Sequence, residues 1–140
     1  MRGVGRKMVD KFIHTSGKRK SAIARATLKK GTGIIRINNQ RLDTFGDHIV
    51  KLRIQEPMIL IGERANEVDV NVRVAGGGTT GQAEAARLAI ARALVAYDKN
   101  LKKSFETYDR LLLVADVRRK ETRKPGRKSK ARSKTQKSYR

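Results

Sequence analysis

The chain has 140 residues, enough for one domain with extensions, and its 34 lysine and arginine residues against 13 acidic residues give a formal net charge of +21. It contains no cysteine, which excludes disulfides and cysteine-ligated zinc. No apolar run approaches the ~18 residues of a membrane-spanning helix, and residues 1–12 lack the apolar segment of a secretory signal, so we expect an intracellular protein.

The positive charge is concentrated at the two ends of the chain. Residues 1–41 hold twelve basic groups and one acid, and residues 118–140 again hold twelve basic groups and one acid. The middle, residues 42–117, has ten basic and eleven acidic groups. Such ends repel each other unless a polyanion is present. Nucleic acid is favoured over a membrane surface, because Leu, Ile, Val and Phe are absent after Val117 and no basic amphipathic helix is possible there.

The first third of the chain predicts β-structure. Residues 12–15 are short and β-prone, and a turn at residues 18–20 is expected to present three positive charges together. Residues 21–28 alternate between small apolar and polar side chains, which predicts a strand with one polar, partly basic face. Residues 34–37 predict a further strand. We interpret 21–28 and 34–37 as the two strands of a β-hairpin.

The middle of the chain mixes both kinds of element. Residues 43–55 have apolar positions three and four apart, which predicts a short helix that Pro57 stops. Residues 58–61 predict a short apolar strand. Residues 68–74, VDVNVRV, alternate valine with polar residues and predict the clearest strand of the chain.

Residues 81–97 are rich in alanine and leucine and predict a long helix, capped by Thr79 or Thr80, whose small faces allow close packing on a sheet. A further short helix and a buried strand at residues 111–115 complete the predicted domain. Beyond Val117 no apolar side chain can anchor the chain, and we expect residues 118–140 to be disordered alone.

The predicted fold class is therefore α+β, a mixed or antiparallel sheet with helices packed on one face, plus a long extended basic C-terminal tail. The expected organisation is a basic N-terminal extension at 1–11, a globular domain at 12–117 and the tail at 118–140.

The stretch GGGTTG, Gly76–Gly81, matches the G-x-G-x-x-G pattern of dinucleotide sites and lies between a predicted strand and a helix. However, the preceding strand has a polar face, and too few residues follow to complete a doubly wound sheet. A flexible turn leading into the helix is the favoured interpretation. A third possibility stays open, that free amides at this helix start hold one backbone phosphate.

The sequence gives no positive signal for catalysis or for a metal or cofactor. His14 and His48 are far apart, without ligand-like spacing, and no serine lies in a nucleophile motif. The basic groups give a much stronger signal. Lys18, Arg19 and Lys20 with Arg25 can each pair with phosphate. The tail, at ~3.3 Å per residue, can span up to ~75 Å and thread between RNA helices.

Three long stretches carry specific motifs: TSGKRKSAIARATLKKGTGIIRINNQRL, VDVNVRVAGGGTTGQAEAARLAIARAL and LLLVADVRRKETRKPGRKSKARSKTQKSYR. They contain, in order, G-K-R-K-x-A-x-A, G-G-G-x-x-G-Q and D-x-R-x-x-E-x-K/R-K-P-G. With these motifs the chain, from about Thr15 to Arg140, resembles the ninth universal small-subunit ribosomal protein family. The ending Q-K-S-Y-R resembles the archaeal and eukaryotic branch, whereas the bacterial branch usually ends F-S-K-R.

The resemblance implies a left-handed β-α-β domain of ribosomal-protein type in the head of the small subunit. It implies a non-enzymatic, cytoplasmic ribosome component without a cofactor, with small-subunit ribosomal RNA, the peptidyl-site transfer RNA and neighbouring head proteins as partners. The implied ribosomal RNA contacts are Lys18, Arg19, Lys20, Arg25, Arg118, Arg119, Arg123, Lys124, Arg127, Lys128, Lys130 and Arg132. The implied transfer RNA contacts are Lys137, Tyr139 and Arg140.

Two other functions are also compatible with the sequence. Charge alone also allows a non-specific, chromatin-like DNA-binding protein, which would not prefer folded RNA over duplex DNA. The glycine-rich stretch allows a small nucleotide-dependent enzyme, which would bind a free nucleotide.

Overall fold

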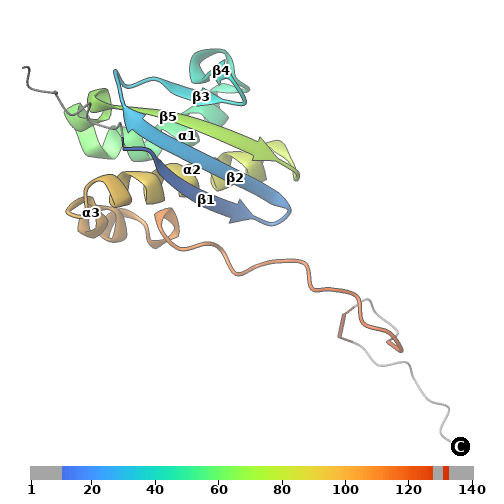
Figure 1. Cartoon of the computed structure of the whole chain (residues 1–140). Helices are drawn as coiled ribbons and strands as arrows, with labels where there is room; N and C mark the ends of the chain where they lie inside the picture. Colours follow the sequence, from blue (N-terminus) through green and yellow to red (C-terminus); the bar gives the residue numbers. More distant parts are fainter. Residues whose placement is uncertain (1–10, 128–130, 133–140) are drawn as a thin grey trace, which may run out of the picture.

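The computed structural model describes residues 11–127 and 131–132. Five strands form one sheet in the order β1-β2-β5-β3-β4 (Figure 1). Their bounds are β1 (Ile13–Arg19), β2 (Ala22–Lys30), β3 (Ile35–Ile37), β4 (Gln40–Arg41) and β5 (Val68–Ala75). All neighbouring strands are antiparallel except β3 and β5, which are parallel. The sheet is therefore mixed, as predicted.

Three α-helices complete the domain: α1 (His48–Ile61), α2 (Thr79–Tyr97) and α3 (Leu101–Tyr108). Short 3-10 helices occur at Leu42–Thr44, Gly62–Glu67 and Arg110–Leu112. Helices α1 and α2 lie behind the sheet as drawn in Figure 1, and no described element covers the opposite side. The predicted α+β class with helices on one face is confirmed. Within the described residues, no helix is both long and apolar enough to cross a bilayer.

Strand periodicity decides which side chains form the core. On β2, Ala22, Ala24 and Ala26 are buried toward the helices while the residues between them face outward. The valines of β5 alternate in the same way, each buried beside an exposed or half-exposed polar residue. The alanines of α2 from Ala83 to Ala93 are almost fully buried, and α2 packs on β1 and β2, so the prediction of a helix lying close on the sheet is confirmed.

The predicted hairpin between residues 21–28 and 34–37 is wrong. Strand β5 lies between β2 and β3, and β2 forms its hairpin with β1 instead. Lys20, with a positive φ of 53°, makes that tight turn. The predicted pairing rested only on adjacency in the sequence. In the structure β2 pairs with β5, whose buried valines continue the apolar face of β2.

The predicted break at Pro57 and the strand at 58–61 are also wrong. Helix α1 continues through Pro57 to Ile61, because Ile54, Pro57 and Met58 are buried against the core. Tertiary packing offsets the backbone hydrogen bond that proline removes. The helix ends instead at Gly62, whose φ of 64° lies in the left-handed region that glycine adopts freely.

The predicted strand at 111–115 does not form. Arg110–Leu112 is a 3-10 turn, started by the Asp109 carboxylate, which accepts a hydrogen bond from the Leu111 amide. Leu112 is fully buried beneath α2 and α3, so the apolar signal came from packing and not from sheet pairing. The further short helix that was expected is α3.

The glycine-rich stretch forms a tight turn between β5 and α2. Gly76 and Gly77 both have positive φ. A Cβ atom at Gly76 would lie 2.7 Å from the carbonyl oxygen of Ser21, and one at Gly77 would make tight 3.0 Å contacts with Ala22. Gly78 is the N-cap of α2, and Thr79 and Thr80 lie inside the helix, so the predicted threonine cap is wrong. The glycines thus serve backbone packing, and the mixed sheet is not doubly wound.

Residues 115–124 contain neither helix nor strand, and the chain runs away from the domain along them (Figure 1).

Candidate nucleic-acid interface

A basic groove lies where the tail leaves the domain. Lys18, Lys20, Ser21 and Ile23 of the β1–β2 hairpin line one side, and Arg118, Arg119 and Lys120 line the other. Its volume is about 790 Å³. The groove therefore brings together cations from the two highly charged ends of the sequence, which lie almost a hundred residues apart along the chain.

The β1–β2 hairpin divides its three consecutive cations between two sides. Lys18 is exposed on the side of the sheet away from the helices, and Lys20 is exposed at the turn. Arg19, one position further along the strand, points toward the helices, and only 13% of its side chain is exposed. The prediction that the turn presents all three charges together is wrong for Arg19, because successive strand side chains alternate.

Arg19 instead connects the domain to the start of the tail. Its Nε donates to Glu84 Oε2 on α2 at 2.6 Å, and its Nη2 lies 3.5 Å from Asp116 Oδ2. Its Nη1 also donates to the backbone carbonyl of Arg118 at 3.4 Å. Glu84 is held from the other side by Arg53, at 2.6 Å. These contacts fix the point at which the chain departs from the sheet.

Asp116 continues this arrangement into the tail. Its Oδ1 accepts the Arg118 amide at 2.9 Å, and its Oδ2 accepts Arg118 Nη2 at 2.8 Å. The hydrogen bond from the Arg118 guanidinium, with help from the Arg118 amide, holds the pKa of Asp116 far below its ordinary value. Asp116 therefore stays ionised and orients Arg118, whose side chain remains 76% exposed at the groove.

The described tail places further predicted cations along an extended path. Arg123 and Lys124 are exposed. Arg132 Nε donates to both carboxylate oxygens of Glu121, at 2.9 and 3.0 Å, and Arg127 donates to the Arg132 carbonyl at 3.0 Å. The remaining predicted contacts lie outside the described residues: Lys128, Lys130, Lys137, Tyr139 and Arg140.

Arg25 lies apart from the groove, on the uncovered side of the sheet. Its Cα partner on β5 is Arg73, and Arg36 of β3 has Arg41 of β4 as its partner. The predicted site omitted Arg36, Arg41 and Arg73. Their signal was available in the strand alternation, which puts Arg73 on the same polar face as Arg25, but the strand order was needed to bring them together.

No group of three or more His, Asp or Glu residues in the described part of the chain could hold a metal ion. Several acids of the helical layer are engaged by arginine. Arg87, for example, contacts Glu56 at 2.7 Å and Asp109 at 3.0 Å. These pairs tie α1 and α2 to the turn that precedes the tail.

Comparison with known proteins identifies the family. A sequence model described as "Ribosomal protein S9/S16" matches residues 17–140. The chain belongs to this ribosomal protein family. Curated relatives named "Small ribosomal subunit protein uS9" include those of Methanococcus maripaludis strain C5 and Methanococcus vannielii, each 47% identical over 133 residues. These alignments cover 93% of this chain and 99% of the relative.

A protein of the same name from Thermoplasma volcanium is 48% identical over 131 residues, covering 92% of this chain and 98% of the relative. The resemblance to the ninth small-subunit ribosomal protein family is thus confirmed. The family match begins at Gly17 and continues to Arg140. It therefore includes both sides of the basic groove and the whole tail.

Proposed function

We propose that this chain is a structural, non-enzymatic constituent of the head of the small ribosomal subunit in the cytoplasm. It binds small-subunit ribosomal RNA and adjoins neighbouring head proteins, and its last residues reach the peptidyl-site transfer RNA. Membership of the ribosomal protein S9/S16 family supports the assignment. The observation that carries it is the basic groove, in which cations from both charged ends converge around an internal ion-pair network.

The ribosomal RNA contacts differ in their geometry. Lys18, Lys20, Arg118 and Arg119 hold phosphates at the groove, and Arg25 acts from the open side of the sheet. Arg19 contributes chiefly by positioning Arg118, because its own guanidinium is engaged by Glu84 and Asp116. Along the tail, phosphates are bound by Arg123, Lys124, Arg127, Lys128, Lys130 and Arg132.

Charge reversal tests the groove. Replacing Lys18 and Lys20 with Glu removes two exposed cations without touching the ion pairs of Arg19. The matched control is Lys99→Glu with Lys103→Glu, which makes the same charge change at exposed positions around α3. We expect the groove variant to be depleted from small subunits on a sucrose gradient while the control variant incorporates normally. Equal incorporation of both variants would overturn this choice of RNA-binding surface.

Truncation tests the tail tip. Removing residues 136–140 should leave incorporation into the small subunit intact, because the groove and most tail cations remain. The loss of Lys137, Tyr139 and Arg140 should weaken retention of transfer RNA in the peptidyl site, measured by filter binding on purified subunits. Unchanged retention would remove the transfer RNA role and leave the ribosomal RNA role in place.

A further inference from the structure

The side of the sheet away from α1 and α2 carries a second set of cations. We call this side the open sheet face. Strand register assigns to it Lys18, Arg25, Lys29, Arg36, Arg41 and Arg73. All six are exposed. In the sequence they are distributed over the basic N-terminal part and the near-neutral middle, so the folding of the sheet concentrates them on one surface.

Register also places like charges opposite each other. Arg25 on β2 faces Arg73 on β5, and Arg36 on β3 faces Arg41 on β4. Directly opposed like charges destabilise a sheet. In the described part of the chain, Arg25, Arg36 and Arg73 have no ion-pair partner, and Arg41 has only Asp43, at 4.0 Å. This arrangement is favourable when an anion binds between the guanidinium groups.

The acidic groups of the described residues do not neutralise this face. The helical layer uses Glu56, Glu84 and Asp109 in ion pairs with its own arginines. The open sheet face presents one carboxylate from its strands, Asp69. Its Oδ1 accepts the backbone amides of the β2–β3 loop, those of Thr32, Gly33 and Ile34, at 2.8 to 3.1 Å. Asp69 thus organises a loop and leaves most of the surrounding positive charge uncompensated.

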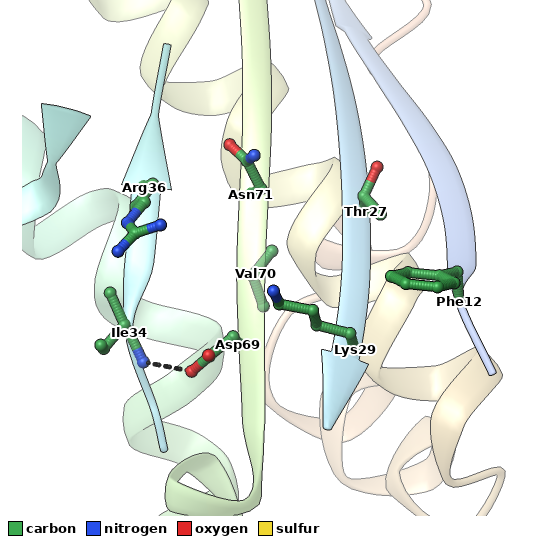
Figure 2. Close-up of a pocket in the computed structure, with 8 residues that line it drawn as sticks. All are labelled: Phe12, Thr27, Lys29, Ile34, Arg36, Asp69, Val70 and Asn71. Atoms are coloured by element: carbon green, nitrogen blue, oxygen red, sulfur yellow. Dashed lines mark hydrogen bonds between the residues drawn. The ribbon is translucent and has the colours of Figure 1, made fainter. Parts of the chain in front are cut away.

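A small pocket lies on this face beside an exposed aromatic ring. Figure 2 shows Phe12 on one side, Arg36 on the other, and Lys29, Asp69 and Asn71 between them. Thr27, Ile34 and Val70 complete the lining. Phe12 is 54% exposed. The pocket volume is about 150 Å³. Sites for whole small molecules usually have volumes of ~300–1,000 Å³. The smaller volume of this pocket suits a single planar group.

We propose that the open sheet face binds a single-stranded segment of RNA, with one unstacked base against Phe12. Arg25 and Arg73 hold one phosphate, and Lys29 and Arg36 hold the backbone beside the base. The amide of Asn71 can donate to and accept from a base edge. The hydroxyl of Thr27, which pairs with His14 Nδ1 at 3.2 Å, keeps a further lone pair for such a contact. The inference rests on the proposed RNA-binding function. The open sheet face adjoins the basic groove and shares Lys18 with it, but the contacts proposed here, Arg25, Lys29, Arg36 and Arg73, do not line the groove.

The combination of groups selects single-stranded RNA among polyanions. In a duplex the bases are stacked inside, so an exposed ring has no base face to contact, whereas splayed bases stack well on aromatic side chains. An acidic protein segment would satisfy the arginines but would not use the ring. A lipid surface needs apolar side chains that insert. Among residues 11–127 and 131–132, the exposed large apolar residues on this face are Phe12 and Ile23.

Tryptophan fluorescence can test base stacking directly, because the chain contains no tryptophan. The Phe12→Trp variant of the full chain is titrated with short oligouridylate and with an RNA duplex of equal phosphate count. Tyr108→Trp is the matched control, since Tyr108 is also 54% exposed but lies on α3. We expect strong quenching of the Phe12→Trp signal by the single strand alone, and little quenching of the control by either RNA.

Charge dependence is tested in the same titration. Adding Arg25→Gln and Arg73→Gln to Phe12→Trp should lower the affinity for the single strand several-fold. It should also reduce the slope of log affinity against log salt concentration by about one, as expected for one or two lost phosphate contacts.

Three outcomes of these titrations would contradict part of the argument. RNA that binds, as detected by anisotropy, without quenching at position 12 would overturn the inference and leave the proposed function standing. Absence of any bound RNA would instead count against the proposed function. If polyglutamate at equal charge displaces the single strand, the open sheet face binds anions in general. That result would overturn the base-binding inference.

Discussion

Gly17 lies where β1 approaches the backbone of α2 closely. A Cβ atom built there would be 2.3 Å from the carbonyl oxygen of Ala85 and 2.7 Å from the amide nitrogen of Ala89. Gly17→Ala should therefore force the helix from the sheet and lower the free energy of unfolding in urea by about 2–3 kcal/mol, the upper range for overpacking.

Gly81→Ala is the matched control for that substitution. A Cβ atom at Gly81 would meet only ordinary contacts, at 3.6 and 3.7 Å. Since Gly81 lies within α2, alanine should leave stability unchanged or raise it by up to about 1 kcal/mol. Equal effects of the two substitutions would contradict the close approach at Gly17.

The carboxylate of Asp69 should make the stability of the fold depend on pH. The Ile34 amide, with those of Thr32 and Gly33, lowers the pKa of Asp69 against the opposing effect of burial. A lowered folded-state pKa means that the ionised carboxylate stabilises the fold above its ordinary pKa of 3.8, and that this stability is lost as the pH falls through the lower folded value. Asp69→Asn should cost about 1 kcal/mol at neutral pH.

The difference between wild type and Asp69→Asn should shrink in acid, as measured by urea unfolding at neutral and strongly acidic pH. Asp47→Asn is the control, because the Asp47 side chain is exposed and makes no capping hydrogen bond to α1. A pH-independent loss in Asp69→Asn would show that the charge itself contributes nothing.

At the scale of elements, the pairing of β2 with β5 puts Arg25 opposite Arg73. Removing one charge relieves repulsion, so Arg73→Gln should raise the free energy of unfolding of the isolated protein by a few tenths of a kcal/mol at low salt, within the ~0.2–1 kcal/mol of cross-strand pairs. Added salt should reduce that gain. The same variant should bind single-stranded RNA more weakly. A loss of stability in Arg73→Gln would mean that the arginine has a structural role that its contacts do not reveal.

At the scale of the whole molecule, the ion pairs of Arg19 and Asp116 orient the tail. Asp116→Asn removes a negative charge, which alone should strengthen RNA binding. Because the carboxylate also positions Arg118, we expect the affinity measured by anisotropy to fall, about two- to five-fold, as for the loss of one modest contact. Glu63→Gln removes the same charge from an exposed site away from the groove and should leave binding unchanged or slightly tighter. A rise in affinity for Asp116→Asn equal to that of Glu63→Gln would exclude the positioning role.

Local patterns predicted the elements far better than their partners. The alternation in residues 68–74 and the alanine-rich run at 81–97 each identified an element that the structure confirms as β5 and α2. The short apolar runs at 58–61 and 111–115 were misassigned, because an apolar stretch of four or five residues has no period and is buried equally well in a helix or a turn.

The residues of the candidate site were likewise predicted only in part. Charge clustering alone identified Lys18, Lys20 and the tail cations as candidate contacts. It could not separate Arg19 from its neighbours, because the ion pairs with Glu84 and Asp116 join residues 65 and 97 positions apart in the sequence. Arg36, Arg41 and Arg73 were missed since each is an isolated cation in the sequence.

The sequence by itself determined the α+β class, the charge of the two ends and the family, because composition, periodicity and motifs are local properties of the chain. The tertiary structure alone decided that β5 separates β2 from β3, that Arg19 turns inward and that six cations share the open sheet face. These depend on strand order and register. The alternation within a strand says which side chains share a face. It does not say which strand lies next to it, because that choice is made by burying apolar faces that are far apart in the sequence.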